Sequence, residues 1–201
     1  SPDHLIQRCM LPMTTATSVL CDSKGHIWTG LYRHGLVDDN GNVFFKGQSP
    51  IKIIEGANGQ LFVLLNGEGL WTLDCNTGAM NHIPTTNPWI MDMTSDGINV
   101  FAATPDMLYI IDVKTLETKT VKAELFKSGH FKDGNKTIIS DKRGWVWMVN
   151  YKCGSDIDVY DTRRQATFSI PVGRNFIVNA MVEDCNGNVW LASNHGLTRI
   201  T

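Results

Sequence analysis

A repeat of about forty residues constrains the fold of this chain more than any other feature. Seven residues of the form Asp-x-x-Gly-x-(Ile/Val)-Trp begin at Asp22, Asp141 and Asp184, and weaker copies occupy residues 56–62 and 95–101. A period of this length indicates a fold built from repeated units. The aromatic residues that end the copies stand 34, 39, 46 and 43 residues apart, and they are Trp28, Phe62, Phe101, Trp147 and Trp190.

Each copy is predicted to form short strands joined by tight turns. Asp accepts hydrogen bonds from its own turn and Gly adopts a positive φ, so Asp-x-x-Gly between apolar runs indicates a hairpin. The alternation in residues 26–29 (His-Ile-Trp-Thr) is typical of a half-buried strand. A Leu follows most of the repeat aromatics by seven or eight positions, usually after Gly, and begins a third strand. Turns that precede a fourth strand are Asp39–Gly41, Asp74–Gly78, Asp112–Thr115 and Asp161–Arg164.

Four short antiparallel strands in every unit predict an all-β fold, a β-propeller with five visible blades. Residues 1–201 would then be a single propeller domain or a propeller segment. A sandwich is the weaker alternative, because it does not require an aromatic residue at one phase of every repeat. In a propeller this residue packs between neighbouring blades, so we expect Trp147→Ala or Trp190→Ala to cost about 3–5 kcal/mol.

The two ends of the sequence leave the number of blades open. The sequence ends on a predicted third strand, residues 196–200, and residues 4–9 have the phase of a fourth strand. An N-terminal strand would complete the last blade and close a five-bladed ring without free edges. The alternative is part of a larger propeller, for example a seven-bladed one.

Charge and composition exclude several classes of function. The formal net charge is −2 and Lys and Arg are scattered, so no nucleic-acid-binding surface is expected. No apolar run reaches the ~20 residues of a membrane span, and no signal-peptide pattern is present, so we expect no membrane contact by this segment. The five cysteines contain no C-x-x-C pair and are expected to be buried thiols. No metal site and no cofactor are predicted.

The motif from Asp184 to Arg199, Asp-x-x-Gly-Asn-Val-Trp-Leu-Ala-Ser-Asn-x-Gly-Leu-x-Arg, resembles the two-component regulator propeller repeat. The stretch from Asp22 to Leu36 is nearly as similar, and the resemblance extends over essentially the whole chain. In that family the repeats form the periplasmic sensor region of hybrid two-component sensor histidine kinases. Many come from gut Bacteroidetes and respond to breakdown products of complex polysaccharides. The resemblance implies a non-catalytic domain of a membrane-anchored protein, a small-molecule or oligosaccharide ligand, and a homodimer at full length.

Strand parity predicts where a ligand would bind. In an antiparallel blade, the loop between the second and third strands lies on the same face as the loop that leads into the next blade. Aromatic rings there suit sugar faces, and forked donors suit carboxylate or sulfate groups. The alternatives are that these loops are merely polar, and that Trp89, which lies outside the aromatic phase, begins an apolar strand. The candidate ligand-binding residues are Tyr32, Arg33, His34, Trp89, Tyr151, Lys152, Arg174, Asn194 and His195.

An enzyme and a protein scaffold are the alternative functions. A propeller glycosidase would need paired carboxylates near the central channel, and Glu55, Asp92 and Glu183 fall on predicted inner strands. A propeller lyase would use histidines, but His34 and His195 share a repeat phase before Gly, which favours a loop-building role. Neither HExxH nor GxSxG occurs, so no catalytic residue is predicted. A protein–protein interaction scaffold like the WD-repeat propellers is the other alternative. The pair of Gly-His and Trp-Asp motifs that is typical of that family is missing from the repeats of this sequence.

Overall fold

The computed structural model describes residues 14–126, 128–129, 132, 134–150, 156–173 and 175–201, and nineteen strands in this part of the chain form five antiparallel sheets. The first two sheets contain β1 (Ala16–Cys21), β2 (Ile27–Leu31), β3 (Gly35–Val37), β4 (Val43–Phe44), β5 (Pro50–Glu55), β6 (Gln60–Leu65), β7 (Gly69–Asp74) and β8 (Met80–Ile83). The others contain β9 (Asp92–Ser95), β10 (Asn99–Ala103), β11 (Met107–Asp112), β12 (Thr118–Lys122), β13 (Asn135–Ser140), β14 (Trp145–Asn150), β15 (Ile157–Asp161), β16 (Ala166–Ile170), β17 (Val178–Glu183), β18 (Val189–Ser193) and β19 (Gly196–Ile200).

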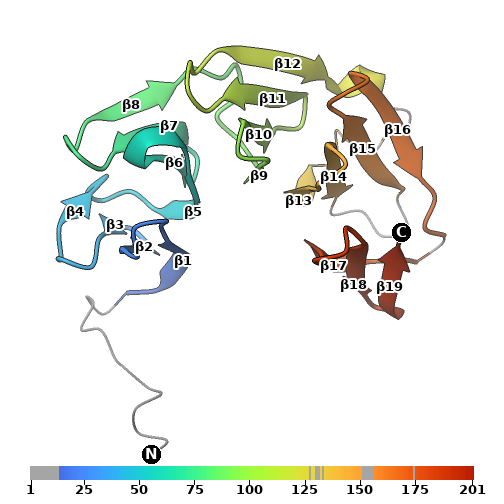
Figure 1. Cartoon of the computed structure of the whole chain (residues 1–201), viewed down its shortest axis with the longest axis horizontal. Coiled ribbons are helices and arrows are strands. Elements are labelled where there is room, and N and C mark those ends of the chain that lie inside the picture. Colours follow the sequence, from blue (N-terminus) through green and yellow to red (C-terminus); the bar gives the residue numbers. More distant parts are fainter. Residues whose placement is uncertain (1–13, 127, 130–131, 133, 151–155, 174) are drawn as a thin grey trace, which may run out of the picture.

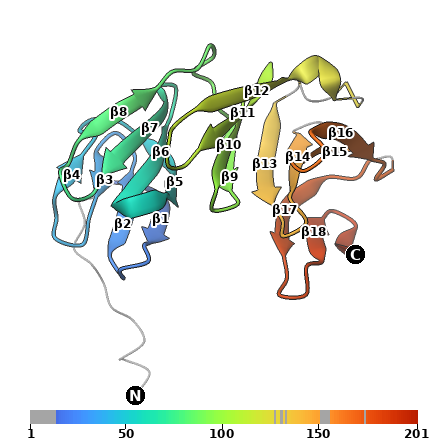
Figure 2. The same ribbon diagram turned by 45° about the horizontal axis from the view of Figure 1, so that its top comes forward.

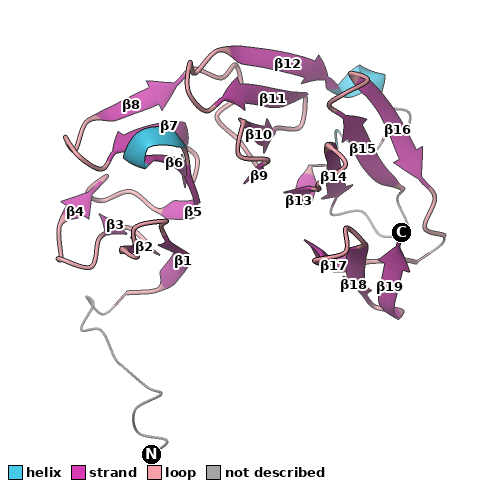
Figure 3. Ribbon diagram, in the orientation of Figure 1, coloured by secondary structure: helices cyan, strands magenta, loops and turns pink. Residues whose placement is uncertain are grey.

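Each sheet is one blade of a β-propeller. Within a blade the strands pair in chain order, with the first strand innermost and the last at the rim (Figures 1 and 3). The inner strands β1, β5, β9, β13 and β17 contact one another in that order. Figure 2 shows the same blades side by side from a tilted direction. The predicted fold class is therefore confirmed. Among the described residues, no helix is long and apolar enough to cross a membrane.

The blades form an open arc in the described part of the chain. β1 and β17 face each other across the open side, and the last sheet has three described strands (Figure 1). The strand predicted at residues 4–9 lies outside the described residues. The number of blades in a closed ring therefore stays a prediction.

The aromatic residue of each repeat fills the space between its own blade and the next. Trp28 belongs to one buried cluster with Ile53 of the second blade, and Trp147 to another with Val189 of the fifth. The two phenylalanines at this phase occupy the same place between the middle blades, and all four rings are at most 4% exposed. The predicted core is confirmed at these four positions. Trp190 is only half-buried because no described blade covers it, so the expected packing between two blades is not found there among the described residues.

In the strongest copies the Asp holds both the turn and the aromatic ring. Asp141 Oδ1 accepts the backbone N–H groups of Arg143 and Trp145, both at 3.0 Å. Its other oxygen, Oδ2, accepts the indole Nε1–H of Trp147 at 2.8 Å. The same bonds recur in the first and fifth blades, with indole-to-carboxylate distances of 3.0 and 2.8 Å. We call this arrangement the Asp–Trp clasp.

The two blades with phenylalanine lack the clasp. The residue six positions before Phe62 is Gly56, and the residue six positions before Phe101 is Ser95. A phenyl ring has no hydrogen-bond donor, so it gives a carboxylate at that position no partner. Asp and Trp are thus present together or absent together in all five repeats, as a hydrogen-bonded pair requires.

Turn aspartates are held in the ionised form by hydrogen bonds. The side chain of Asn188 and the repeat indole lower the pKa of Asp184 far below the ordinary value of 3.8. Backbone N–H groups lower the pKa of Asp74, Asp112 and Asp161 from the same value. These shifts mean that the folded state favours the charged carboxylates.

A double-mutant cycle tests the clasp of the fourth blade. Trp147→Phe should cost about 1–2 kcal/mol, because the indole N–H is lost while Arg143 still contacts the carboxylate. Asp141→Ala should cost about 3 kcal/mol, because several buried donors lose their acceptor. The double variant resembles the second blade, so its cost should fall short of the sum by about 1–2 kcal/mol in denaturant unfolding. Strictly additive costs would show that the clasp contributes nothing.

Acid should weaken the fold in a defined range of pH. Because the folded-state pKa values lie below the unfolded value of 3.8, these carboxylates stabilise the protein fully above about pH 5. That stabilisation is lost as the pH falls through 3.8 towards the folded-state values. Urea unfolding should therefore give a free energy that declines below about pH 4, and Asp184→Asn should make the decline shallower. A decline identical to that of the unchanged protein would refute the role of Asp184.

Candidate functional site

The predicted common face exists, and we call it the loop face. The N–H of Gly47, in the linker that leads into the second blade, donates to the carbonyl of His34 at 3.0 Å. The N–H of Arg33 donates to Ser49 Oγ of the same linker at 2.9 Å. These bonds join the loop between β2 and β3 to the segment that leads into the next blade. The geometric part of the strand-parity argument is therefore confirmed, whereas ligand binding there stays a prediction.

The first blade presents a stacked cation and aromatic ring on the loop face. The Arg33 guanidinium lies 5.2 Å from the centre of the Tyr32 ring, which is 43% exposed. Arg33 has a φ of 52°, in the left-handed region that side chains with a Cβ disfavour. His34 is half-buried beside them. Such strain at an exposed residue is a feature that binding loops often share.

In the fifth blade the predicted residues build the loop itself. The Asn194 side chain donates to the carbonyl of Asn175 at 2.8 Å and accepts the N–H of Ile177 at 2.8 Å. The His195 ring stacks on Phe176 with centroids 5.8 Å apart. Both ends of the Asn194 amide are thus engaged by the backbone. These contacts agree with the loop-building interpretation of His195.

Trp89 lies in the linker between β8 and β9 and is 62% exposed. Its N–H donates to Asn87 Oδ1 at 2.9 Å, and the neighbouring Ile90 is buried. Because β9 begins at Asp92, the alternative that Trp89 starts a strand is wrong. The linker therefore turns Ile90 into the core and leaves the indole of Trp89 on the surface.

The structure spreads the predicted site over three blades. Among the described residues, no hydrogen bond, ion pair or ring contact joins the groups on the first, third and fifth blades. Three predicted residues lie outside the described residues: Tyr151, Lys152 and Arg174. A ligand that engages more than one described group would have to extend across the arc.

The acids considered for catalysis join neighbouring blades. Glu55 Oε2 accepts the N–H of Ser23, in the first turn of the preceding blade, at 2.8 Å. Glu183 Oε1 accepts the N–H of Lys142 in the equivalent way at 2.9 Å. The two glutamates occupy matching ends of β5 and β17, so they act at different blade interfaces. These hydrogen bonds between blades give both glutamates a structural role on the inner strands.

Asp92 connects three inner strands. Its Oδ1 lies 2.8 Å from Lys52 Nζ on β5, and its Oδ2 accepts the N–H of Ile138 on β13 at 3.1 Å. Asp92 is 9% exposed. Within the described residues, no group of three or more His, Cys, Asp or Glu side chains could hold a metal ion.

The cysteines differ from their prediction. Cys21 and Cys185 are exposed, and Cys75 is half-buried between the first and second blades. Burial, reinforced by Asp22 and Asp74, raises the pKa of the Cys75 thiol to about 11. The prediction of buried thiols is therefore wrong for Cys21 and Cys185, while Cys9 and Cys153 lie outside the described residues.

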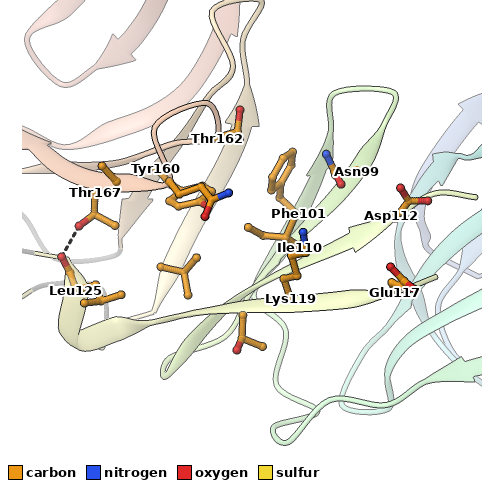
Figure 4. Close-up of a pocket in the computed structure, with 14 residues that line it drawn as sticks. Asn99, Phe101, Ile110, Asp112, Glu117, Lys119, Leu125, Tyr160, Thr162 and Thr167 are labelled. Carbon is orange, nitrogen blue, oxygen red and sulfur yellow. Dashed lines mark hydrogen bonds between the residues drawn. The ribbon is translucent and has the colours of Figure 1, made fainter. Parts of the chain in front are cut away.

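A cavity of about 580 Å³ opens between the third and fourth blades, and we call it the blade 3–4 cleft (Figure 4). Sequence reasoning missed it, although an unusual turn residue marks it: Gln165 adopts a positive φ of 51° where glycine is usual. Residues from both blades line the cleft, among them Phe101, Ile110, Tyr160, Asn99, Lys119 and Gln165.

No protein-family model and no curated protein matches the sequence. Among solved structures, the extracellular domain of the hybrid two-component system BT4673 from B. thetaiotaomicron is similar, with a TM-score of 0.72, 17% identity, and coverage of 95% of this chain and 27% of that one. A streptogramin B lyase is also similar (TM-score 0.74, 16% identity, 95% of this chain, 66% of that one). PorZ of the Porphyromonas gingivalis type-IX secretion system has a TM-score of 0.60 and 16% identity over 92% of this chain and 24% of that one.

Likeness at this level of identity shows the fold, which is that of a β-propeller. The chain spans about a quarter of the length of the B. thetaiotaomicron domain and of PorZ. The proteins that share the fold include an extracellular domain of a two-component system, a lyase and a component of a secretion system, so fold alone does not assign a function.

Removing Asp92 tests whether this acid is structural. Asp92→Ala leaves the Lys52 ammonium and the Ile138 N–H without their acceptor, and we expect a loss of about 1–3 kcal/mol in urea unfolding. Lys52 is partly exposed, which keeps the loss below that of a fully buried pair. Asp92→Asn retains an acceptor and should cost less. Stability equal to that of the unchanged protein in both variants would contradict the structural role.

Proposed function

We propose that this propeller is the non-catalytic ligand-binding part of an extracytoplasmic two-component sensor, and that its ligand is an oligosaccharide. The observation that carries the proposal is the exposed indole of Trp89 on the loop face, outside the aromatic phase of the repeat. The resemblance of the repeat to two-component regulator propellers supports it. The shared fold with an extracellular two-component domain also supports it.

The loop face offers two kinds of group that bind sugars. An exposed indole can stack on the apolar face of a sugar ring while its N–H reaches a hydroxyl. The Arg33 guanidinium supplies forked donors for hydroxyl or carboxylate oxygens, and the Tyr32 ring beneath it limits its motion. An oligosaccharide is long enough to contact groups on separate blades, whereas a monosaccharide is not.

A catalytic role receives less support from the described site. The acids that a glycosidase would use accept backbone hydrogen bonds or pair with a lysine at blade interfaces. His195 is stacked in its own loop. The likeness to a streptogramin B lyase is one of fold at 16% identity and brings no catalytic residue to this chain.

Signalling would follow from a shift between conformations of a larger assembly. A ligand changes that equilibrium only by binding one state more tightly than another. The proposed parent protein is membrane-anchored and homodimeric, with the propeller in the periplasm. The propeller itself would bind the ligand. The difference in binding free energy between the two conformations would then shift the equilibrium of the whole assembly.

Thermal unfolding in the presence of polysaccharide fragments tests the proposal. A fragment present at 100 times its dissociation constant should stabilise the fold by about 2.7 kcal/mol, which raises the Tm measurably. Product analysis of the same mixtures should show no turnover. Cleavage of a fragment would contradict the sensor proposal and indicate an enzyme. An unchanged Tm with every fragment would favour a protein scaffold.

Single variants locate the binding face. Trp89→Ala and Arg33→Ala should each weaken the bound fragment at least about tenfold, equivalent to about 1.4 kcal/mol. Ile98→Ala is the matched control, because Ile98 is 65% exposed on the turn between β9 and β10, away from the loop face. Unchanged affinity in both loop-face variants would disprove the assignment of this face.

A further inference from the structure

The linker that carries Trp89 is tied to the third blade by a tyrosine hydroxyl. The hydroxyl of Tyr109 accepts the N–H of Thr86 at 2.9 Å and lies 2.6 Å from Thr86 Oγ1. Thr86 stands three residues before Trp89 in the linker between β8 and β9, whereas Tyr109 belongs to β11 of the blade that this linker enters. One side chain therefore makes two polar contacts that fix the linker on its own blade.

The backbone is also held on both sides of Trp89. Before it, the side chain of Asn87 accepts the N–H of Trp89 at 2.9 Å. After it, Ile90 is 5% exposed in the core, and the N–H of Met91 donates to the carbonyl of Ala103 on β10 at 2.8 Å. The indole is exposed, but the segment that presents it is anchored before and after.

Tyr109 occupies a strand position that also holds a linker in the fourth blade. Tyr109 and Asp158 each pair with the residue that directly follows the repeat aromatic of their own blade. Asp158 accepts the hydroxyl of Ser128, in the linker that enters the fourth blade, at 2.7 Å. Anchoring of an incoming linker by the third strand therefore recurs in the two blades, and in the third blade the anchored linker carries an exposed tryptophan.

Burial of the tyrosine ring makes this anchor rigid. Tyr109 is 3% exposed, and its ring belongs to the buried cluster that also contains Phe62 of the second blade. The hydroxyl is thus held in place by packing between two blades before it contacts Thr86. A binding group that is fixed in advance loses less conformational freedom when a ligand arrives.

We infer that Tyr109 is a positioning residue for the loop face, because it holds the linker in the conformation that presents the Trp89 indole. Tyr109 is buried and acts through the linker. Without its hydroxyl the linker would populate other conformations, and the apparent affinity for a ligand would fall with the population of the binding conformation. The inference rests on the proposed function for the ligand, but the fixed linker can be tested without one.

Amide hydrogen exchange tests the fixed linker in the free protein. Tyr109→Phe keeps the buried ring, so exchange of the Thr86 N–H should accelerate about tenfold, as expected for the loss of one hydrogen bond. The Trp89 N–H should also exchange faster, because the whole linker opens more often. Tyr160→Phe is the matched control: it removes the hydroxyl of a tyrosine that is 6% exposed on the fourth blade, and both amides should be unaffected. Unchanged exchange in Tyr109→Phe would overturn the inference.

A double-mutant cycle tests whether the fixed linker matters for binding. The probe is maltohexaose, cellohexaose or xylohexaose, whichever raises the Tm most, and its affinity is measured by calorimetric titration. Tyr109→Phe should weaken binding about fivefold in the unchanged chain and cause no further loss in Trp89→Ala, because it acts through the indole. Equal losses in both backgrounds would show a general structural effect and overturn the positioning role.

The two measurements separate this inference from the proposed function. Binding that is lost in Trp89→Ala and kept in Tyr109→Phe contradicts the positioning role alone. Binding that Trp89→Ala leaves unchanged contradicts the loop face as the binding site. If no oligosaccharide binds the unchanged chain, the proposed function fails, and the exchange rates of the Thr86 and Trp89 amides still decide whether Tyr109 fixes the linker.

Discussion

A hydrogen bond of 2.8 Å between Asp141 and the indole of Trp147 couples two levels of the structure. One oxygen of the carboxylate orders the turn that starts a blade, and the other fixes the ring that fills the space before the next blade. Local turn chemistry and long-range packing therefore depend on the same side chain. Where a phenyl ring replaces the indole, as at Phe62 and Phe101, the residue six positions earlier is not an aspartate.

A second set of contacts holds the inner strands. Glu55 and Glu183 each accept an N–H from the first turn of the preceding blade, and Asp92 joins β5, β9 and β13. Apolar packing between blades has no direction of its own, whereas these bonds have fixed donors and acceptors. They orient each blade against its neighbour. The exposed indole of Trp89 lies outside this packing, although the neighbouring Ile90 belongs to the core.

Much of the architecture follows from periodicity, because every repeat must bury one aromatic residue at the same phase. The surface position of Trp89 could be suspected for the same reason, since it breaks that phase. The partial burial of Trp190 could not be predicted from the repeat, because it depends on what packs against the last blade. The exposed thiol of Cys185 follows the repeat Asp, at a turn position that is also exposed at Ser23 and Lys142. The cleft was missed because its volume depends on the sizes of residues in two blades at once. The sequence shows a glutamine at position 165, but it does not show that this residue adopts a positive φ.

Each blade interface has two unlike sides, since one blade contributes the aromatic residue and the next contributes the surface that buries it. A change at one aromatic position therefore alters a single interface and leaves the others as they were. In evolutionary terms, the repeat allows one interface to change its aromatic residue, as at Phe62 and Phe101, while other blades keep the Asp–Trp pair. Substitutions can accumulate in this way at one interface of a propeller whose remaining blades preserve the fold.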